Sequence, residues 1–283
     1  MNRFTPNHAP LAAARSFLFV PANRPERFEK ALSSGADAVI LDLEDSVPPE
    51  DKALARDAIA QQWANLMAQP KPVVIRINPP LGDVGAADLA WLSGLTPCPA
   101  VMVAKADDAQ TLKAVRIACP EAPLLPLIES ARGYASLASI AATAQVVRLV
   151  VGHIDFMVDT GMQCSPDQRE LDALRFAVAI QTRLNHLAPA VDGVTVDVDD
   201  PTLLRADTLR ALRFGFGAKL CIHPKQVASV HEALAPTPEE VSWAHRVLEG
   251  NRAAGGAAFK LDGRMVDAPV VLQAQRILAR DRR

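Results

Sequence analysis

Two carboxylates end two short apolar runs in the middle of the chain. Glu129 ends residues 124–129 and Asp155 ends residues 148–155. Runs this short, bounded by Pro and Gly, are typical of strands buried on both faces. Charged groups are almost never buried unless they are paired or bound to a metal. We therefore interpret Glu129 and Asp155 as candidate ligands of Mg²⁺, a hard cation that prefers oxygen; a salt bridge at the rim of the sheet is the alternative.

Basic side chains also stand at the ends of apolar runs. The planar fork of Arg76 suits a carboxylate or carbonyl oxygen of a substrate, and a structural ion pair with Glu44 or Asp45 is the alternative. Asp42 and Asp45 are more typical of a capping, loop-fixing pair than of catalysts. Lys105 suits an ion pair or a substrate contact, and forms a Schiff base only if it is desolvated. Together these groups suit an anionic substrate held through a divalent cation.

Strand-like and helix-like segments alternate from Arg15 to about Leu234. Eight strand–helix pairs over about 220 residues predict a (β/α)₈ TIM barrel, whose chemistry lies at the C-terminal ends of the strands. An open doubly wound sheet is the alternative, but the turn after the first strand lacks the glycine-rich dinucleotide fingerprint. The expected strands are 16–20, 38–41, 73–78, 100–103, 124–129, 148–155, 191–196 and 218–222.

The chain continues beyond what a barrel needs. We predict a barrel at 15–235 and a C-terminal helical extension at 236–283, which would pack on a neighbouring subunit. Thr237-Pro238-Glu239-Glu240 is a strong helix start. The expected elements of the extension are a helix at 237–253, a hairpin or loop at 260–266 and a final helix at 268–282.

Composition limits the class of protein. The chain has 283 residues, 49% of them hydrophobic and 22% charged, which predicts a large core rather than disorder. A net charge of −2 offers no basic excess for nucleic acid or an anionic membrane. The N-terminus lacks an apolar leader, no run approaches ~20 apolar residues, and the four cysteines match no zinc or redox spacing. We expect a cytoplasmic protein with reduced thiols that acts on small molecules.

Seven stretches occur in an order that resembles a known family. They are 15–22 (RSFLFVPA), 36–47 (ADAVILDLEDSV), 76–78 (RIN), 127–129 (LIE), Gly152-x-x-Asp155, 219–224 (KLCIHP) and 262–267 (DGRMVD). Together they resemble the citrate lyase β-subunit-like (CitE-like) proteins of the HpcH/HpaI aldolase/citrate lyase superfamily. The resemblance runs from Arg15 to the C-terminus, and the combined pattern is far more specific than any single stretch.

The resemblance implies a Mg²⁺-dependent barrel enzyme that cleaves or forms a carbon–carbon bond. Such a lyase acts on citryl-, malyl- or citramalyl-CoA and yields a 2-oxo acid and an acyl-CoA. Members are commonly homotrimers or larger homo-oligomers. By position in the motifs, Glu129 and Asp155 resemble the two metal ligands.

Other residues gain roles from the same resemblance. Arg76 is similar to a clamp on a substrate oxygen, with Glu44 and Asp45 beside it as catalytic residues. Arg15 would lie near the substrate or CoA. Asp267 resembles the acidic residue of a C-terminal segment that reaches a neighbouring subunit's site and handles the proton, which would explain the extension.

Two positions depart from the family pattern. Ile154 stands where an acidic residue often precedes the metal-binding Asp, and Ala104 where Pro often precedes the fourth-strand Lys. The motifs therefore do not specify the acyl group. Two other functions stay open: a class I aldolase that works through Lys105, and a subunit of a larger lyase complex whose carrier presents the acyl group.

Overall fold

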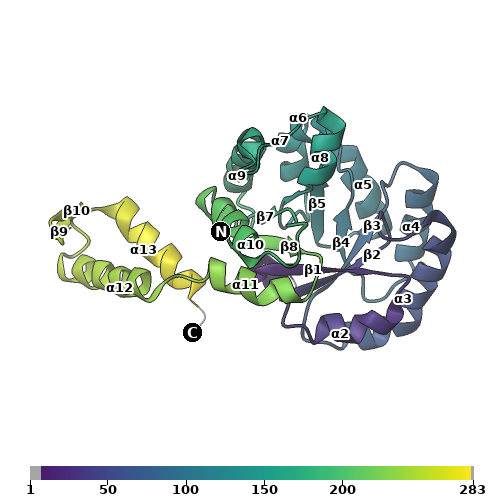
Figure 1. The fold of residues 1–283 in the computed structure, drawn as a ribbon, viewed down its shortest axis with the longest axis horizontal. Helices are drawn as coiled ribbons and strands as arrows, with labels where there is room; N and C mark the ends of the chain where they lie inside the picture. Colours follow the sequence, from purple (N-terminus) through teal and green to yellow (C-terminus); the bar gives the residue numbers. More distant parts are fainter. Residues whose placement is uncertain (1–7, 282–283) are drawn as a thin grey trace. The chain divides into compact units, whose positions relative to one another are not determined.

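The structure, a computed structural model, describes residues 8–281. These divide into two compact units, one ending at Val230 and the other beginning at His231. The first unit is a closed barrel of parallel strands in the order β1 to β8, which confirms the predicted (β/α)₈ fold (Figure 1). The strands are β1 (Ser16–Pro21), β2 (Ala38–Asp42), β3 (Val73–Ile77), β4 (Ala100–Val103), β5 (Leu124–Ile128), β6 (Val150–Val151), β7 (Val191–Asp192) and β8 (Ala218–Cys221).

Helices connect the strands and surround the barrel (Figure 1). Short 3₁₀ turns lead into three of them: η2 (Pro25–Arg27), η3 (Pro49–Asp51) and η4 (Arg169–Leu171). Proline is common at the first position of a helical turn. The backbone N–H at that position has no partner within the helix, so proline, which lacks an N–H, loses no hydrogen bond there. The helices are α1 (Ala9–Ala13), α2 (Phe28–Leu32), α3 (Lys52–Met67), α4 (Asp83–Leu92), α5 (Ala109–Ala118), α6 (Ala131–Ala135), α7 (Leu137–Ala142), α8 (His153–Thr160), α9 (Asp172–Leu184), α10 (Pro201–Arg213) and α11 (Lys225–Leu234).

The sixth strand is shorter than predicted. We expected a strand over 148–155 followed by a loop, but β6 ends at Val151 and α8 begins at His153. Asp155 therefore lies in the first turn of a helix and not at the end of a strand. A carboxylate is favourable there because the amide dipoles leave the N-terminus of a helix partly positive.

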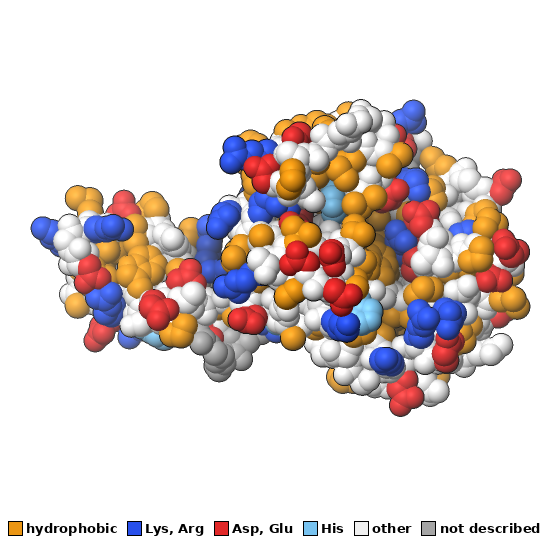
Figure 2. All heavy atoms as spheres, in the orientation of Figure 1, with side chains coloured by type: hydrophobic (Ala, Val, Ile, Leu, Met, Phe, Trp, Pro, Cys, Tyr) orange, Lys and Arg blue, Asp and Glu red, His pale blue; other side chains and the backbone are white. Residues whose placement is uncertain are grey.

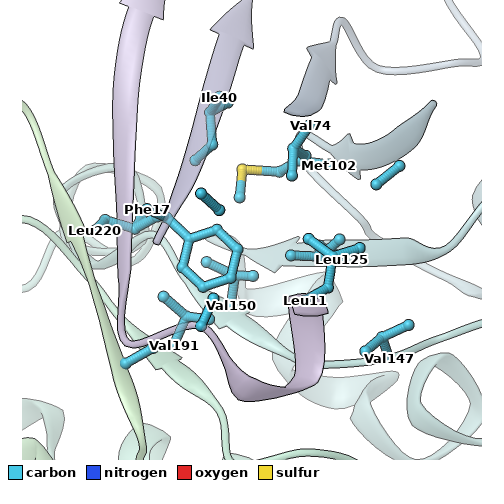
Figure 3. Packing of buried hydrophobic residues seen from close by; sticks show 14 of the residues in the cluster. Leu11, Phe17, Ile40, Val74, Met102, Leu125, Val147, Val150, Val191 and Leu220 are labelled. Carbon is cyan, nitrogen blue, oxygen red and sulfur yellow. The ribbon is translucent and has the colours of Figure 1, made fainter. Parts of the chain in front are cut away.

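Apolar side chains from the strands fill the barrel. Phe17, Ile40, Met102 and Leu125 belong to one buried cluster, which Leu11 of α1 joins (Figure 3). A buried guanidinium, that of Arg148, holds α1 in place. It donates to the backbone oxygens of Leu11 (3.1 Å), Ala14 and Pro189 (2.6 Å). These bonds pair the guanidinium with three backbone oxygens, as buried polar groups require.

Residues 236–281 form two helices and a hairpin, as the sequence predicts. They are α12 (Pro238–Ala253), β9 (Phe259–Leu261), β10 (Arg264–Val266) and α13 (Ala268–Arg280). Thr237 and Glu240 form the expected capping box, and Asp262 and Gly263 both take positive φ in the hairpin turn, as type I′ turns require. Val247, Val266 and Ile277 are among the residues of a separate small core.

The surface agrees with the near-neutral composition. On the face that Figure 2 shows, acidic and basic side chains are interspersed and do not gather into one basic patch. No helix within residues 8–281 combines the length and apolar character needed to cross a bilayer. The four cysteines are free thiols.

Candidate metal and substrate site

The guanidinium of Arg76, near the C-terminal end of β3, is paired with two carboxylates. The register of β2 and β3 puts Asp42 directly opposite Arg76. Both carboxylate oxygens of Asp42 accept from Arg76, one from Nε and one from Nη2, each at 2.6 Å. Nη1 of Arg76 lies 3.0 Å from Oε2 of Glu44, and the Phe19 ring centroid lies 4.8 Å from the guanidinium carbon. Because guanidinium has five N–H donors, both terminal nitrogens keep a donor for a substrate oxygen.

The charge of Arg76 keeps its carboxylate partner ionised. Burial alone would raise the pKa of Asp42, but the hydrogen bonds and charge of Arg76 outweigh that effect and lower it below its usual value. Bidentate pairs between Arg and a carboxylate are strong and directional. Arg76 is therefore fixed in orientation before any substrate binds.

Lys105 links this pair to the predicted metal ligand. Its Nζ donates to Oε1 of Glu44 at 2.5 Å and lies 4.0 Å from Oδ1 of Asp45. Its backbone N–H donates to Oε1 of Glu129 at 2.6 Å. Lys105 has a φ of +45°, a left-handed conformation that costs a non-glycine residue about 1–3 kcal/mol and is often found at functional sites. In this conformation the backbone N–H of Lys105 donates to the carboxylate of Glu129.

Glu129 lies against the start of α8. Its side chain is buried, and a Cβ at Gly152 would stand 2.5 Å from its Oε2. Only glycine therefore lets the chain entering α8 pass this close to the carboxylate. One turn on, α8 carries Asp155, which is partly exposed. The negative charge of Asp155 reaches Glu129, since it is one of the causes that raise the pKa of Glu129.

The pKa of Glu129 is raised to about 8. Burial is the largest cause, and the negative charges of Glu44 and Asp155 add to it, against the opposing hydrogen bond from Lys105. Two cationic partners, buried Arg76 and half-exposed Lys105, do not balance the group. Its ionisable members are five carboxyl groups and two cations: Asp42, Glu44, Asp45, Glu129, Asp155, Arg76 and Lys105. A divalent cation beside Glu129 would offset most of this excess.

The donor set fits Mg²⁺. Within residues 8–281, no group of three or more His, Cys, Asp and Glu side chains is arranged to hold a metal. Glu129 and Asp155 are the two predicted ligands; they would supply two oxygen atoms, and substrate and water the others. Mg²⁺ is commonly held in this way, by one or two carboxylates with several waters retained; Zn²⁺ sites usually have three or four protein ligands.

Two other predicted residues, Arg15 and Asp267, lie elsewhere in the chain's structure: one at the opposite end of the barrel and one in the second unit. Arg15 immediately precedes β1, and its backbone N–H and Nε donate to Asp37. At ~3.3 Å per residue, the length of a strand separates that end of the barrel from the C-terminal ends. Asp267 lies in the second unit, where it is the exposed N-cap residue of α13 and its side chain makes no capping hydrogen bond. An N-cap Asp whose carboxylate accepts no hydrogen bond from the helix N–H groups is unusual.

One residue, Asp42, has a larger role in the site than the sequence predicts. Asp42 was interpreted as a loop-fixing residue, and it does accept from the backbone N–H groups of Glu44 (2.9 Å) and Ser46 (3.3 Å). Its larger role is as the bidentate partner of Arg76. The available signal was strand alignment, because Asp42 and Arg76 each stand at or next to the last position of adjacent parallel strands.

Comparison with known proteins adds a family and relatives. A profile of the HpcH/HpaI aldolase/citrate lyase family matches residues 15–224. A citrate lyase subunit beta-like protein of Mycobacterium tuberculosis is 36% identical over 276 residues, which cover 95% of this chain and 96% of that protein. A (3S)-malyl-CoA thioesterase of Cereibacter sphaeroides is 30% identical, with 94% of each chain covered.

A solved structure extends this similarity to the fold. The crystal structure of CitE from Mycobacterium tuberculosis in complex with magnesium, acetoacetate and coenzyme A superposes with a TM-score of 0.82 and 34% identity. The match covers 95% of this chain and 98% of that one.

Proposed function

We propose that this chain, which belongs to the HpcH/HpaI aldolase/citrate lyase family, is a Mg²⁺-dependent lyase that cleaves a 3-hydroxyacyl-CoA thioester into a 2-oxo acid and an acyl-CoA. Citryl-, malyl- and citramalyl-CoA are the candidate substrates. The observation that carries the proposal is the placement of Arg76, held by Asp42 and Glu44, in one linked group with the buried carboxylate of Glu129. The relative of known structure binds magnesium and coenzyme A together.

Each side chain has a defined task in this reaction. Glu129 and Asp155 would hold Mg²⁺, which when bound acts as a Lewis acid on the substrate oxygens. The free N–H groups of Arg76 donate to the oxygen on which negative charge develops, a contribution worth about 3 kcal/mol for one well-placed donor. Glu44 keeps Arg76 and the Lys105 ammonium in place from one carboxylate. In cleavage a base takes the hydroxyl proton, the carbon–carbon bond breaks to leave the carbonyl of the 2-oxo acid, and the thioester enolate that departs is protonated at its α-carbon.

We propose that Asp267 of a neighbouring subunit, in a homotrimer or larger homo-oligomer, delivers the proton to that α-carbon. The carboxylate of Asp267 is exposed and is not used in capping α13, so it is available for proton transfer. In the condensation direction, the same carboxylate removes the α-proton.

Mixed oligomers test whether sites are shared. Glu129→Gln and Asp267→Asn are each expected to be inactive alone. If subunits assort at random, coexpression of both should restore about a quarter of the wild-type activity, because some sites combine an intact Glu129 with a neighbour's intact Asp267. Absence of any recovery in mixed oligomers, isolated with two affinity tags, would contradict the shared site.

Pairing with Glu44 argues against Schiff-base chemistry at Lys105. Burial alone would lower the pKa of Lys105, but the hydrogen bond and charge of Glu44 outweigh it, and the pKa is raised. The amine is thus held as an ammonium, which cannot attack a carbonyl. Borohydride treatment with pyruvate should leave Lys105 unmodified by peptide mass analysis, and an adduct there would support the class I aldolase instead.

Binding of Mg²⁺ should depend on pH. Because the pKa of Glu129 is raised to about 8, the metal must displace a proton at neutral pH. The apparent affinity should rise close to tenfold per pH unit up to about pH 8 and level off above it, with about one proton released below that pH. Titration calorimetry in two buffers of different ionisation enthalpy measures both quantities. A flat affinity without proton release would contradict the assignment of Glu129.

A substrate screen tests the function itself. Purified protein with Mg²⁺ is incubated with malyl-, citramalyl- and citryl-CoA, and both the 2-oxo acid and free CoA thiol are followed. A lyase yields the 2-oxo acid without free thiol, whereas hydrolysis, the activity of the thioesterase relative, yields thiol alone. If free CoA esters give neither product, a carrier-dependent subunit becomes the better proposal.

A further inference from the structure

We propose that Lys52, the first residue of α3, is a positioning residue for the Glu44 carboxylate; this role rests on the proposed lyase site. The Lys52 side chain is buried. Its Nζ donates to the backbone oxygens of Leu43 (2.8 Å) and Glu44 (3.0 Å) and to Oδ1 of Asn78 (2.9 Å). An ammonium has three N–H donors, so each one has a partner, and all three partners are uncharged.

Asn78 connects Lys52 to the outer helices. Its backbone N–H and Nδ2 both donate to Oδ2 of Asp88, at 2.9 and 2.8 Å, and Asp88 is fully buried in α4. The other oxygen of Asp88 accepts from Nη1 of Arg56 at 2.8 Å. Two residues of α3 and one of α4 therefore brace the end of β3 and the turn that follows β2.

The braced turn carries Glu44. Its backbone N–H donates to Oδ1 of Asp42, and its backbone oxygen accepts from Val47 N (3.1 Å) as well as from Lys52. With the backbone fixed on both sides, the Glu44 carboxylate spans the 3.0 Å contact to Arg76 and the 2.5 Å contact to Lys105. Lys52 thus acts behind the site, on the residue that aligns both cations.

Loss of Lys52 should loosen this turn without unfolding the barrel. The Leu43 oxygen would keep its hydrogen bond from Asn78 Nδ2 (2.8 Å), and the Glu44 oxygen its bond from Val47 N. Only Oδ1 of Asn78 loses its partner among the three acceptors. The variant therefore separates positioning from folding, because most of the turn's hydrogen bonds persist.

Lys52→Met tests the proposal, with Lys30→Met, at an exposed position of α2, as the matched control. We expect Lys52→Met to lower kcat about 10- to 100-fold, to leave Mg²⁺ affinity within about twofold because neither metal ligand contacts Lys52, and to unfold within a few degrees of wild type. Its crystal structure should show Glu44 Oε2 out of hydrogen-bonding range of Arg76 Nη1. An unchanged kcat, or a Glu44 carboxylate still bridging Arg76 and Lys105, would overturn it.

A second variant and a second measurement cover other outcomes. Lys52→Gln keeps two N–H donors and should give an intermediate loss of kcat; if Lys52→Met does not fold, faster amide exchange over residues 43–47 in Lys52→Gln decides the question, and unchanged exchange overturns the proposal. If wild-type protein cleaves no thioester, the proposed function fails. The position of Glu44 in the Lys52→Met crystal still decides the positioning role.

Discussion

Glu129→Gln is expected to lower kcat/KM at least about 1,000-fold. The amide keeps the shape of the side chain but removes one of the two carboxylates assigned to Mg²⁺, and a bound metal contributes several kcal/mol of charge stabilisation. Affinity for Mg²⁺, measured by calorimetry, should fall at least tenfold. EDTA should reduce wild-type activity to the level of the variant and leave the variant unchanged.

The same substitution should stabilise the metal-free protein at alkaline pH. The pKa of Glu129 is raised from 4.5 to about 8 in the folded chain, so its contribution to stability is complete below about pH 4.5 and is lost as the pH rises through about 8. A neutral amide avoids that loss. Metal-free Glu129→Gln should therefore unfold several degrees above metal-free wild type at pH 9, where the difference is on the order of a few kcal/mol.

A loss of activity together with a gain in stability distinguishes a carboxylate that serves function from one that serves the fold. Glu29→Gln, at an exposed position of α2, should change neither quantity. A Glu129→Gln variant with near-normal activity and unchanged Mg²⁺ dependence would rule out Glu129 as a ligand.

The sequence was sufficient where one local feature decided the structure. Eight apolar runs separated by helical segments predict the barrel because few folds bury that pattern. Glu129 and Arg76 stood out because a charge at the end of a buried strand requires a partner. The capping box at Thr237 likewise follows from adjacent residues, and α12 begins there.

It was insufficient where distant elements had to be aligned. The pairing of Asp42 with Arg76 depends on the register of β2 and β3, which packing of the whole barrel sets. The apolar run before Asp155 is compatible both with a strand and with the start of a helix, because periodicity does not distinguish the two in so short a run. Lys52 has the pattern of a solvated lysine near a helix N-terminus, yet the fold buries it. Arg15 precedes the first strand, so the sequence already places it at the end of the barrel opposite the site, and only the family resemblance assigned it a role near the substrate or CoA.

Arg76→Lys is expected to lower kcat/KM about 100- to 1,000-fold, although the positive charge is kept. Lysine cannot reproduce the two parallel bonds to Asp42 at 2.6 Å together with the contact to Glu44, because its ammonium is a point charge and not a planar fork. The donor aimed at the developing oxyanion is thereby lost, at a cost of about 2.7–4 kcal/mol.

The kinetic pattern identifies what Arg76 does. If it stabilises the transition state, kcat falls with kcat/KM; if it only binds substrate, KM rises alone. We expect the first pattern, with Mg²⁺ affinity retained, because the contacts of Arg76 are with Asp42 and Glu44 and not with the assigned metal ligands. Arg205→Lys, on the exposed face of α10, is the matched control. An Arg76→Lys variant that loses Mg²⁺ affinity and kcat together would instead indicate collapse of the whole charged group, which melting curves of the two variants would reveal.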